Sequence, residues 1–167
     1  MRMETVQPKR KSGRIPNFDY SSAGAYFVTL CTEKRRNVLG TVVGGGVLDA
    51  PRIDLSPYGT LVEDMLLSIT KTYNDVSIDK YIIMPNHIHM IVTLSPKDGP
   101  SRTPAPTNMR LPSLISTLKR FSNRATGIPL WQRSYYDHVI RSEADYLRIW
   151  QYIDDNPAKW AEDEYYV

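Results

Sequence analysis

The sequence predicts an α+β domain of the ferredoxin-like or RRM-like kind, in which one antiparallel sheet packs against helices. Two observations predict this fold. The chain has 167 residues, the size of one ordinary domain with its own hydrophobic core. Its apolar patterns follow the order strand, hairpin, helix, strand, strand, helix, short strand and helix. Helices placed between antiparallel strands favour a single sheet with its helices against it.

The first half of the chain supplies a strand, a hairpin and a helix. Residues 25–31 are rich in aromatic and β-branched side chains, which predicts a buried strand. Residues 39–48 predict a hairpin whose two apolar arms turn at a glycine triplet. Ser56 followed by Pro57 is typical of a helix start, and apolar residues then recur at helical spacing as far as Tyr73.

The second half supplies the remaining strands and two further helices. Apolar patterns predict strands at 76–83, 86–94 and 135–140 and an amphipathic helix whose apolar face runs from Leu111 to Phe121. Ser142 is a plausible cap for the last long helix. We expect this helix to end at Asn156, because Pro157 disfavours the helical conformation for the residue before it.

We expect one domain, 1–167, with two segments that add little to its core. Residues 1–17 show no periodicity and are predicted to form an extended basic arm. Residues 95–112 hold five of the twelve prolines and are expected to form a mobile loop.

Composition excludes several classes of protein. Hydrophobic residues make up 41% of the chain and charged residues 23%, which excludes a disordered or collagenous protein. The single cysteine, Cys31, cannot form an internal disulfide, and no pair of cysteines exists to hold a structural zinc ion. No apolar run is long enough for a membrane span, and the first residues do not resemble a signal peptide. We therefore expect a cytoplasmic protein.

The net charge of +3 is unevenly distributed along the chain. Residues 1–36 carry an excess of positive charge, and residues 142–167 carry an equal excess of negative charge. Two interpretations stay open: the two ends attract each other, or the basic end binds an anionic partner.

Two histidines form the first candidate site. His87 and His89 lie on a predicted strand, where positions two apart share a face, so both imidazoles could bind one metal ion. The alternative is a pair of polar residues on the exposed face of a half-buried strand.

Tyr152 and Asn156 form the second candidate site. They are four residues apart on the last predicted helix, and therefore lie on the same side of it. The asparagine carbonyl is a possible metal ligand, and a deprotonated tyrosine is a nucleophile that can form a phosphoester. The alternatives are a tyrosine packed in the core and an asparagine that caps the helix. No carboxylate base is evident beside Tyr152, whose phenol is expected to keep an ordinary pKa of about 10.

Four ordered blocks of sequence carry a family resemblance. They are residues 24–32 with Arg35 and Arg36, residues 84–89, residues 131–133 with 137–141, and residues 152–157. In these blocks and their spacing the chain resembles the REP-associated tyrosine transposases, which belong to the single-tyrosine HUH-type transposases and nucleases. The likeness covers nearly the whole chain and implies the HUH endonuclease fold.

The resemblance also implies an activity and the residues that perform it. His87 and His89 would be metal ligands, Asn156 would complete the metal site, and Tyr152 would be the nucleophile. The implied cofactor is Mg²⁺ or Mn²⁺, and the implied partner is single-stranded DNA with a REP-like hairpin. The implied reaction is DNA cleavage and rejoining through a 5′-phosphotyrosine intermediate. The alternatives are a DNA-binding module of the same fold that cuts nothing, and a protein with a purely structural metal.

Three basic clusters are candidates for binding DNA phosphates. They lie in the N-terminal arm, after the first strand and on the outer side of the second helix: Lys9, Arg10, Lys11 and Arg14; Arg35 and Arg36; Lys119, Arg120 and Arg124. His138 is either a DNA contact or a packing residue, and we favour packing. Arg148 is either a phosphate clamp or a solvated charge. We expect association with the nucleoid when DNA is bound, and leave a monomer or a homodimer open.

Overall fold

The computed structural model describes residues 22–46, 49–96 and 110–167. The expected basic arm, with Lys9, Arg10, Lys11 and Arg14, lies outside these residues. So does most of the expected proline-rich loop. In the described part of the chain, no helix is both long enough and apolar enough to cross a membrane.

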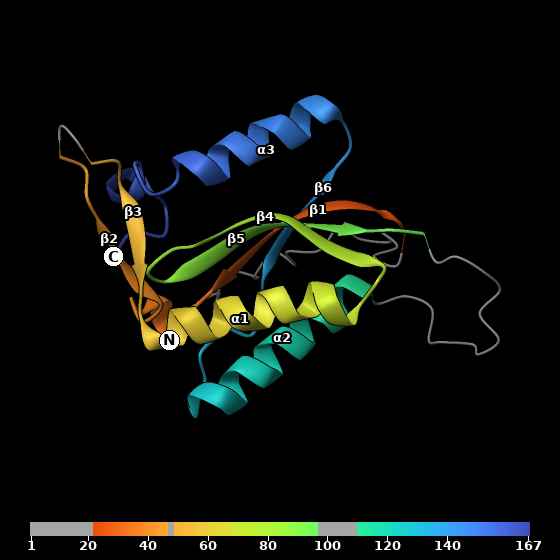
Figure 1. Ribbon diagram of the computed structural model, residues 1–167, viewed down its shortest axis with the longest axis horizontal. Helices are drawn as coiled ribbons and strands as arrows, with labels where there is room; N and C mark the ends of the chain where they lie inside the picture. The colour runs from red at the N-terminus through yellow and green to blue at the C-terminus, as the bar shows by residue number, and fades with distance from the viewer. Residues whose placement is uncertain (1–21, 47–48, 97–109) are drawn as a thin grey trace, which may run out of the picture.

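A four-stranded antiparallel sheet forms the centre of the fold (Figure 1). Its strands lie in the order β4 (Val76–Ile83), β5 (His87–Leu94), β1 (Gly24–Cys31) and β6 (Tyr136–Ile140). Along the chain, helix α1 (Pro57–Thr72) comes between β1 and β4, and helix α2 (Arg110–Thr126) comes between β5 and β6. This strand and helix order is that of the ferredoxin-like fold, so the predicted fold class is confirmed.

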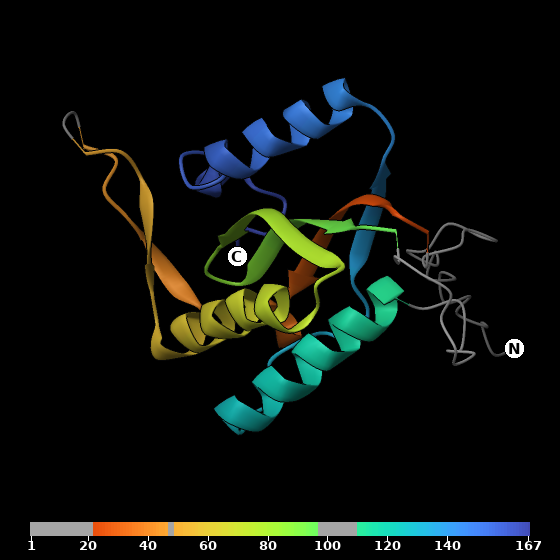
Figure 2. The same cartoon turned by 45° about the vertical axis from the view of Figure 1, so that its right-hand side comes forward.

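Helices cover both faces of the sheet. Helices α1 and α2 lie on one face, and α3 (Glu143–Asp155) lies on the other (Figure 2). Adjacent residues of β1 point to opposite faces: Val28 is buried in the core below α1 and α2, and Phe27 packs with Ile149 and Ile153 of α3. The sheet therefore separates a large core from a small one, and α3 rests on the small one.

The helix starts agree with the prediction. Ser56 caps α1 by accepting a hydrogen bond from the Gly59 backbone N–H at 3.1 Å, and Pro57 occupies the first helical position. Ser142 caps α3 in the same way, accepting from the Asp145 N–H at 3.2 Å. Helices α1 and α3 end at Thr72 and Asp155, each within one residue of its predicted end. Asn156 nevertheless keeps helical φ and ψ angles of −57° and −42°, so the expected effect of Pro157 on its conformation is wrong.

The predicted hairpin is wrong in its second arm. Strand β2 (Gly40–Val43) pairs with β3 (Arg52–Leu55) rather than with residues before 49. Gly44 and Gly45 have φ angles of 85° and 94°, a region that glycine occupies without strain. A glycine triplet turns the chain but offers no side chain for packing, so the second strand begins only where Ile53 and Leu55 alternate.

Helix α2 differs from the prediction in three places. It begins at Arg110, inside the segment expected to be a loop, because Pro112 is tolerated in a first helical turn. Phe121 is 47% exposed, since Ser122 takes the next inward position and accepts a hydrogen bond from the Trp131 indole at 2.6 Å. Lys119 does not point outward: its ammonium donates to the carbonyls of Gln132, Arg133 and Ser134 at 2.8, 3.2 and 3.1 Å.

Candidate metal and nucleophile site

The two histidines of β5 are buried under α3. His87 pairs with Cys31 and His89 with Thr29 across the β1–β5 ladder. The histidine side chains are 0% and 1% exposed, and their ring centroids lie 4.4 Å apart. Burial in the interior lowers the pKa of His87 to about 4 and that of His89 well below its usual value. The alternative of an exposed pair is therefore wrong, and both imidazoles are neutral at pH 7.

Asn86 fixes the tautomer of His87. Its side-chain NH₂ donates to the carbonyls of Tyr165 and Arg35 at 2.7 and 3.3 Å, so its Oδ1 must face His87. The His87 Nδ1–H donates to this oxygen at 2.9 Å. The lone pair of His87 is thus on Nε2, which is buried without a hydrogen-bond partner.

His89 connects the sheet to the nucleophile candidate on α3. Its Nδ1 lies 2.8 Å from Thr29 Oγ1, and its Nε2 lies 3.2 Å from the hydroxyl of Tyr152. The Tyr152 ring stands edge-on to Phe27, with centroids 6.0 Å apart, while the side chain stays 39% exposed. The structure therefore brings the two candidate sites of the sequence into one.

The Tyr152 hydroxyl has a perturbed pKa. Burial raises it to about 12, with a further contribution from the negative charges of Asp163 and Glu164. The expectation of an ordinary pKa is wrong because it left out both the burial and these two carboxylates, which follow α3 in the sequence.

Asn156 ends α3 and points into the site rather than only capping the helix. The residue is 2% exposed, and its Nδ2 donates to Asp163 Oδ2 at 3.0 Å. Its Oδ1 is buried without a hydrogen-bond partner, like His87 Nε2. Buried polar atoms without partners are rare and require an explanation such as a bound ion.

The donor atoms at this site fit a divalent cation. One ligand atom from each of His87, His89 and Asp163 lies within 4.8 Å of the others, and Asn156 adds an amide oxygen. Amide and carboxylate oxygens suit Mg²⁺ and Mn²⁺, and imidazole suits transition metals. Cys31 is a poor ligand, because burial raises the pKa of its thiol to about 11 and only the thiolate binds metal well.

The segment that follows α3, residues 160–167, covers the site; we call it the tail segment. The ring of Tyr165 lies 4.6 Å from that of His87, centroid to centroid. Arg35 donates to the Glu164 carbonyl at 2.9 Å and lies over the Tyr165 ring. Sequence reasoning missed this segment as part of the site. Its only signal was the excess of acidic residues near the end of the chain.

A cleft of about 470 Å³ opens beside Tyr152. Its lining includes Tyr136, His138 and Arg148. His138 is hydrogen-bonded to Asp145 at 2.7 Å, and Arg148 pairs with the same carboxylate at 2.6 Å. The His138 side chain is 37% exposed at the cleft.

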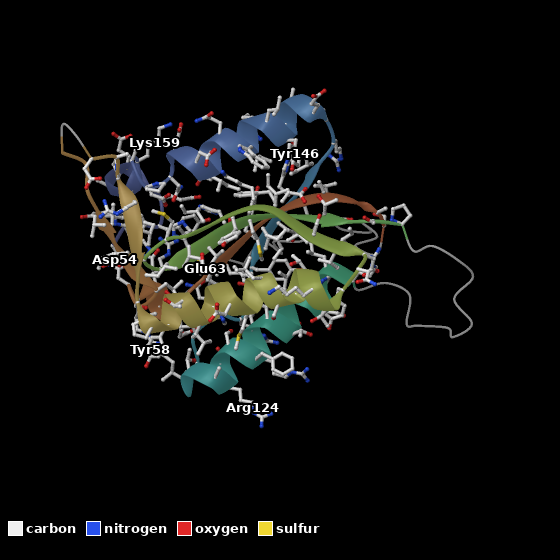
Figure 3. All side chains as sticks on the ribbon, viewed as in Figure 1. Asp54, Tyr58, Glu63, Arg124, Tyr146 and Lys159 are labelled. Atoms are coloured by element: carbon white, nitrogen blue, oxygen red, sulfur yellow. The ribbon has the colours of Figure 1, made fainter. Side chains whose placement is uncertain are left out.

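Two of the predicted basic clusters fall in the described part of the chain, the one after β1 and the one on α2. Arg36 is exposed and donates to the Pro129 carbonyl at 3.2 Å. Arg120 and Arg124 are exposed on α2, across the sheet from α3. Figure 3 shows Arg124 on the outer side of α2 and Tyr146 on α3.

Comparison with known proteins gives the class of protein that this fold and this site define. Residues 21–156 match the family model described as transposase, IS200-like. The chain therefore belongs to the family of IS200-like transposases, which confirms the predicted resemblance at the level of the family.

Two relatives extend this result. A Haemophilus influenzae protein described as uncharacterised is 30% identical over 176 residues, which cover 95% of this chain and 93% of that protein. The solved structure of a REP-associated tyrosine transposase bound to a REP hairpin matches with a TM-score of 0.62 and 19% identity. That match covers 90% of this chain and 76% of the other, and shows that the two proteins share a fold.

Proposed function

We propose that this transposase is a metal-dependent single-stranded DNA endonuclease and strand transferase with Tyr152 as its nucleophile. The observation that carries the proposal is the position of the Tyr152 hydroxyl, 3.2 Å from His89 Nε2, beside the two buried atoms without partners, His87 Nε2 and Asn156 Oδ1. Membership of a transposase family supports DNA as the substrate. The hairpin bound to the structural relative supports hairpin-marked DNA.

His87, His89 and Asn156 are the proposed ligands of Mg²⁺ or Mn²⁺. When bound, such an ion polarises the scissile phosphate as a Lewis acid. All three ligands are neutral, because burial keeps the imidazoles unprotonated, so they do not reduce the charge available to the phosphate. Asn86 holds His87 with Nε2 free, and this outer hydrogen bond is of the kind that orients metal-ligating histidines.

The reaction begins when the Tyr152 oxygen attacks the phosphorus atom. The new bond joins this oxygen to phosphorus, the bond from phosphorus to the 3′ oxygen breaks, and the leaving oxygen takes up a proton to become a free 3′-OH. The product is a 5′-phosphotyrosine. Attack by another 3′-OH reverses these steps and rejoins the DNA. Because the pKa of Tyr152 is about 12 without metal, we expect metal binding to promote loss of its proton.

The cleft beside Tyr152 is the proposed path of the DNA strand. Tyr136 is 50% exposed there, which suits stacking against an unpaired base. The guanidinium of Arg148 is exposed at the same cleft and suits contact with a phosphate.

The test is covalent attachment of the protein to labelled hairpin DNA on a denaturing gel. We expect a protease-sensitive adduct in the presence of Mn²⁺, none in EDTA and none with Tyr152→Phe. The matched control is Tyr146→Phe, since Tyr146 lies on the same helix but donates to Asp79 at 3.0 Å instead of reaching the histidines.

Two outcomes would contradict the proposal. An adduct formed by Tyr152→Phe would mean that another residue is the nucleophile. Salt-sensitive binding of hairpin DNA by the wild type, with no adduct under any condition, would favour a DNA-binding module that cuts nothing.

A further inference from the structure

Asp163 of the tail segment contacts Asn156 and lies close to both histidines, yet the proposed mechanism gives it no role. We propose that Asp163 is a positioning residue, which holds the Asn156 amide with its oxygen turned toward the metal site. The inference rests on the proposed function, because it requires Asn156 to be a metal ligand.

The hydrogen bond between the two residues fixes the orientation of the amide. An amide group has two sides of similar shape, and only its partners decide which side carries the oxygen. Asp163 Oδ2 accepts a hydrogen bond from Asn156 Nδ2 at 3.0 Å, and a carboxylate can only accept. The NH₂ must therefore face Asp163, which leaves Oδ1 buried without a partner on the other side.

Asp163 is itself held in place by the backbone of the tail segment. Its Oδ1 accepts a hydrogen bond from the Tyr165 N–H at 2.7 Å. The Tyr165 carbonyl in turn accepts from Asn86 Nδ2 at 2.7 Å, and Asn86 orients His87. One short stretch of backbone thus connects the group that orients His87 with the group that orients Asn156.

A direct ligand role for Asp163 is the competing explanation, because one of its oxygens lies within 4.8 Å of the histidine nitrogens. Both of its oxygens already accept hydrogen bonds, from Tyr165 and from Asn156. The buried oxygen without a partner belongs to Asn156. The observations therefore favour Asn156 as the ligand and Asp163 as the residue that positions it.

The test is Mn²⁺ affinity, measured by calorimetric titration of the full chain after removal of metal. The proteins are the wild type, Asp163→Asn, Asn156→Ala and the double variant. Asp163→Asn keeps the shape of the side chain and an oxygen for the Tyr165 N–H. The new amide can both donate and accept, so it no longer fixes the orientation of the Asn156 amide. The matched control is Glu162→Gln, which removes an exposed carboxylate of the same segment.

We expect Asp163→Asn to weaken Mn²⁺ binding by about 10- to 100-fold and Glu162→Gln to change it little. In the Asn156→Ala background, Asp163→Asn should weaken Mn²⁺ binding less than about threefold, because a residue that acts through Asn156 has nothing left to position. Melting temperatures measured in EDTA detect any loss of the fold. Such a loss would lower the melting temperature equally with Asn156 present and with Asn156→Ala.

Two results would overturn this inference and leave the proposed function standing. One is unchanged Mn²⁺ affinity in Asp163→Asn, and the other is an equal loss in both backgrounds, which is the behaviour of a direct ligand. A wild type that binds no Mn²⁺ would contradict the proposed metal site and the inference with it.

Discussion

Asn86 joins three parts of the chain through one buried amide. It reaches the carbonyl of Arg35 after β1, the carbonyl of Tyr165 in the tail segment and the ring of His87 on its own strand. The side chain is 0% exposed, so water cannot replace the hydrogen bonds when the amide is removed. Both the proposed metal site and the fold around it therefore depend on this residue.

We predict that Asn86→Ala weakens Mn²⁺ binding by about 10- to 100-fold, because the His87 ring loses the acceptor that fixes its tautomer. The substitution should also lower the free energy of unfolding by about 1–3 kcal/mol, since it leaves buried polar groups without partners. Calorimetry and urea denaturation measure the two effects. Asn37→Ala is the control, because Asn37 is exposed and its side chain donates a long hydrogen bond to the Val167 carbonyl, at 3.4 Å. Full Mn²⁺ affinity in Asn86→Ala would show that His87 does not need this acceptor.

Because both histidines are buried, we predict that the protein loses stability in acid. Burial lowers the pKa of His87 from 6.5 to about 4, so between these pH values the unfolded chain binds more protons than the folded protein. The contribution of the neutral histidine to the free energy of unfolding is therefore fully present above about pH 6.5. It falls as the pH decreases, by at most about 1.4 kcal/mol per pH unit for each such histidine. Urea denaturation in EDTA at pH 7.5 and pH 5.5 measures the loss. His87→Gln should reduce it, and an undiminished loss in this variant would assign the effect to other groups.

Helix α1 packs closely against the start of the β2–β3 hairpin. A Cβ atom added at Gly59 would overlap the backbone carbonyl oxygen of Leu39, which is itself buried. Alanine normally stabilises a helix relative to glycine by up to about 1 kcal/mol. At this position the collision reverses that preference.

We therefore predict that Gly59→Ala lowers the free energy of unfolding by about 1–3 kcal/mol, because backbone or helix must shift to make room. Urea denaturation measures the change. Gly46→Ala is the control, since an added Cβ there meets no atom within 4 Å. An equal or higher stability for Gly59→Ala would show that the helix moves away at little cost.

The sequence predicted elements well where side-chain pattern and cap chemistry agree. Ser56 and Ser142 mark their helix starts through side-chain hydrogen bonds to nearby residues, and such local signals are visible in a sequence. The second arm of the hairpin could not be placed, because pairing of Val43 with Arg52 depends on the path of the glycine-containing loop. The inward direction of the Lys119 ammonium likewise depends on carbonyls of a loop that follows α2.

The candidate site lies between the sheet and α3. Helix α2, which carries the exposed Arg120 and Arg124, lies on the opposite face of the sheet (Figure 2). DNA that contacts both would have to extend around the domain. Arg120 and Arg124 would then contribute affinity without taking part in the proposed reaction at Tyr152.

We predict that the double variant Arg120→Ala, Arg124→Ala binds hairpin DNA more weakly and with a smaller dependence on salt. Each lost phosphate contact should reduce the slope of log affinity against log salt by about 0.7–0.9. The yield of Tyr152 adduct at saturating DNA should stay unchanged. Lys71→Ala, at an exposed position at the end of α1, is the control. An unchanged salt slope, measured by fluorescence anisotropy, would remove this face from the DNA path.

The candidate site was predictable in its motifs but not in its full composition. His87 with His89, and Tyr152 with Asn156, follow from strand and helix spacing, and the structure places the two pairs together. Asp163 and Tyr165 stand in no periodic relation to either pair. They reach the site only because the chain folds back after α3 and forms hydrogen bonds to Asn156 and Asn86, contacts that arise in tertiary structure.

The chain folding back after α3 also puts an indole beside the proposed metal site. The ring centroid of Trp160 lies 5.9 Å from that of His87. Paramagnetic ions such as Mn²⁺ quench the emission of a nearby indole, whereas diamagnetic Mg²⁺ does not. The chain has three tryptophans, and the part of the emission that is lost in Trp160→Phe therefore offers an optical readout of site occupancy in the unlabelled protein. Competition by Mg²⁺ would appear as recovered emission.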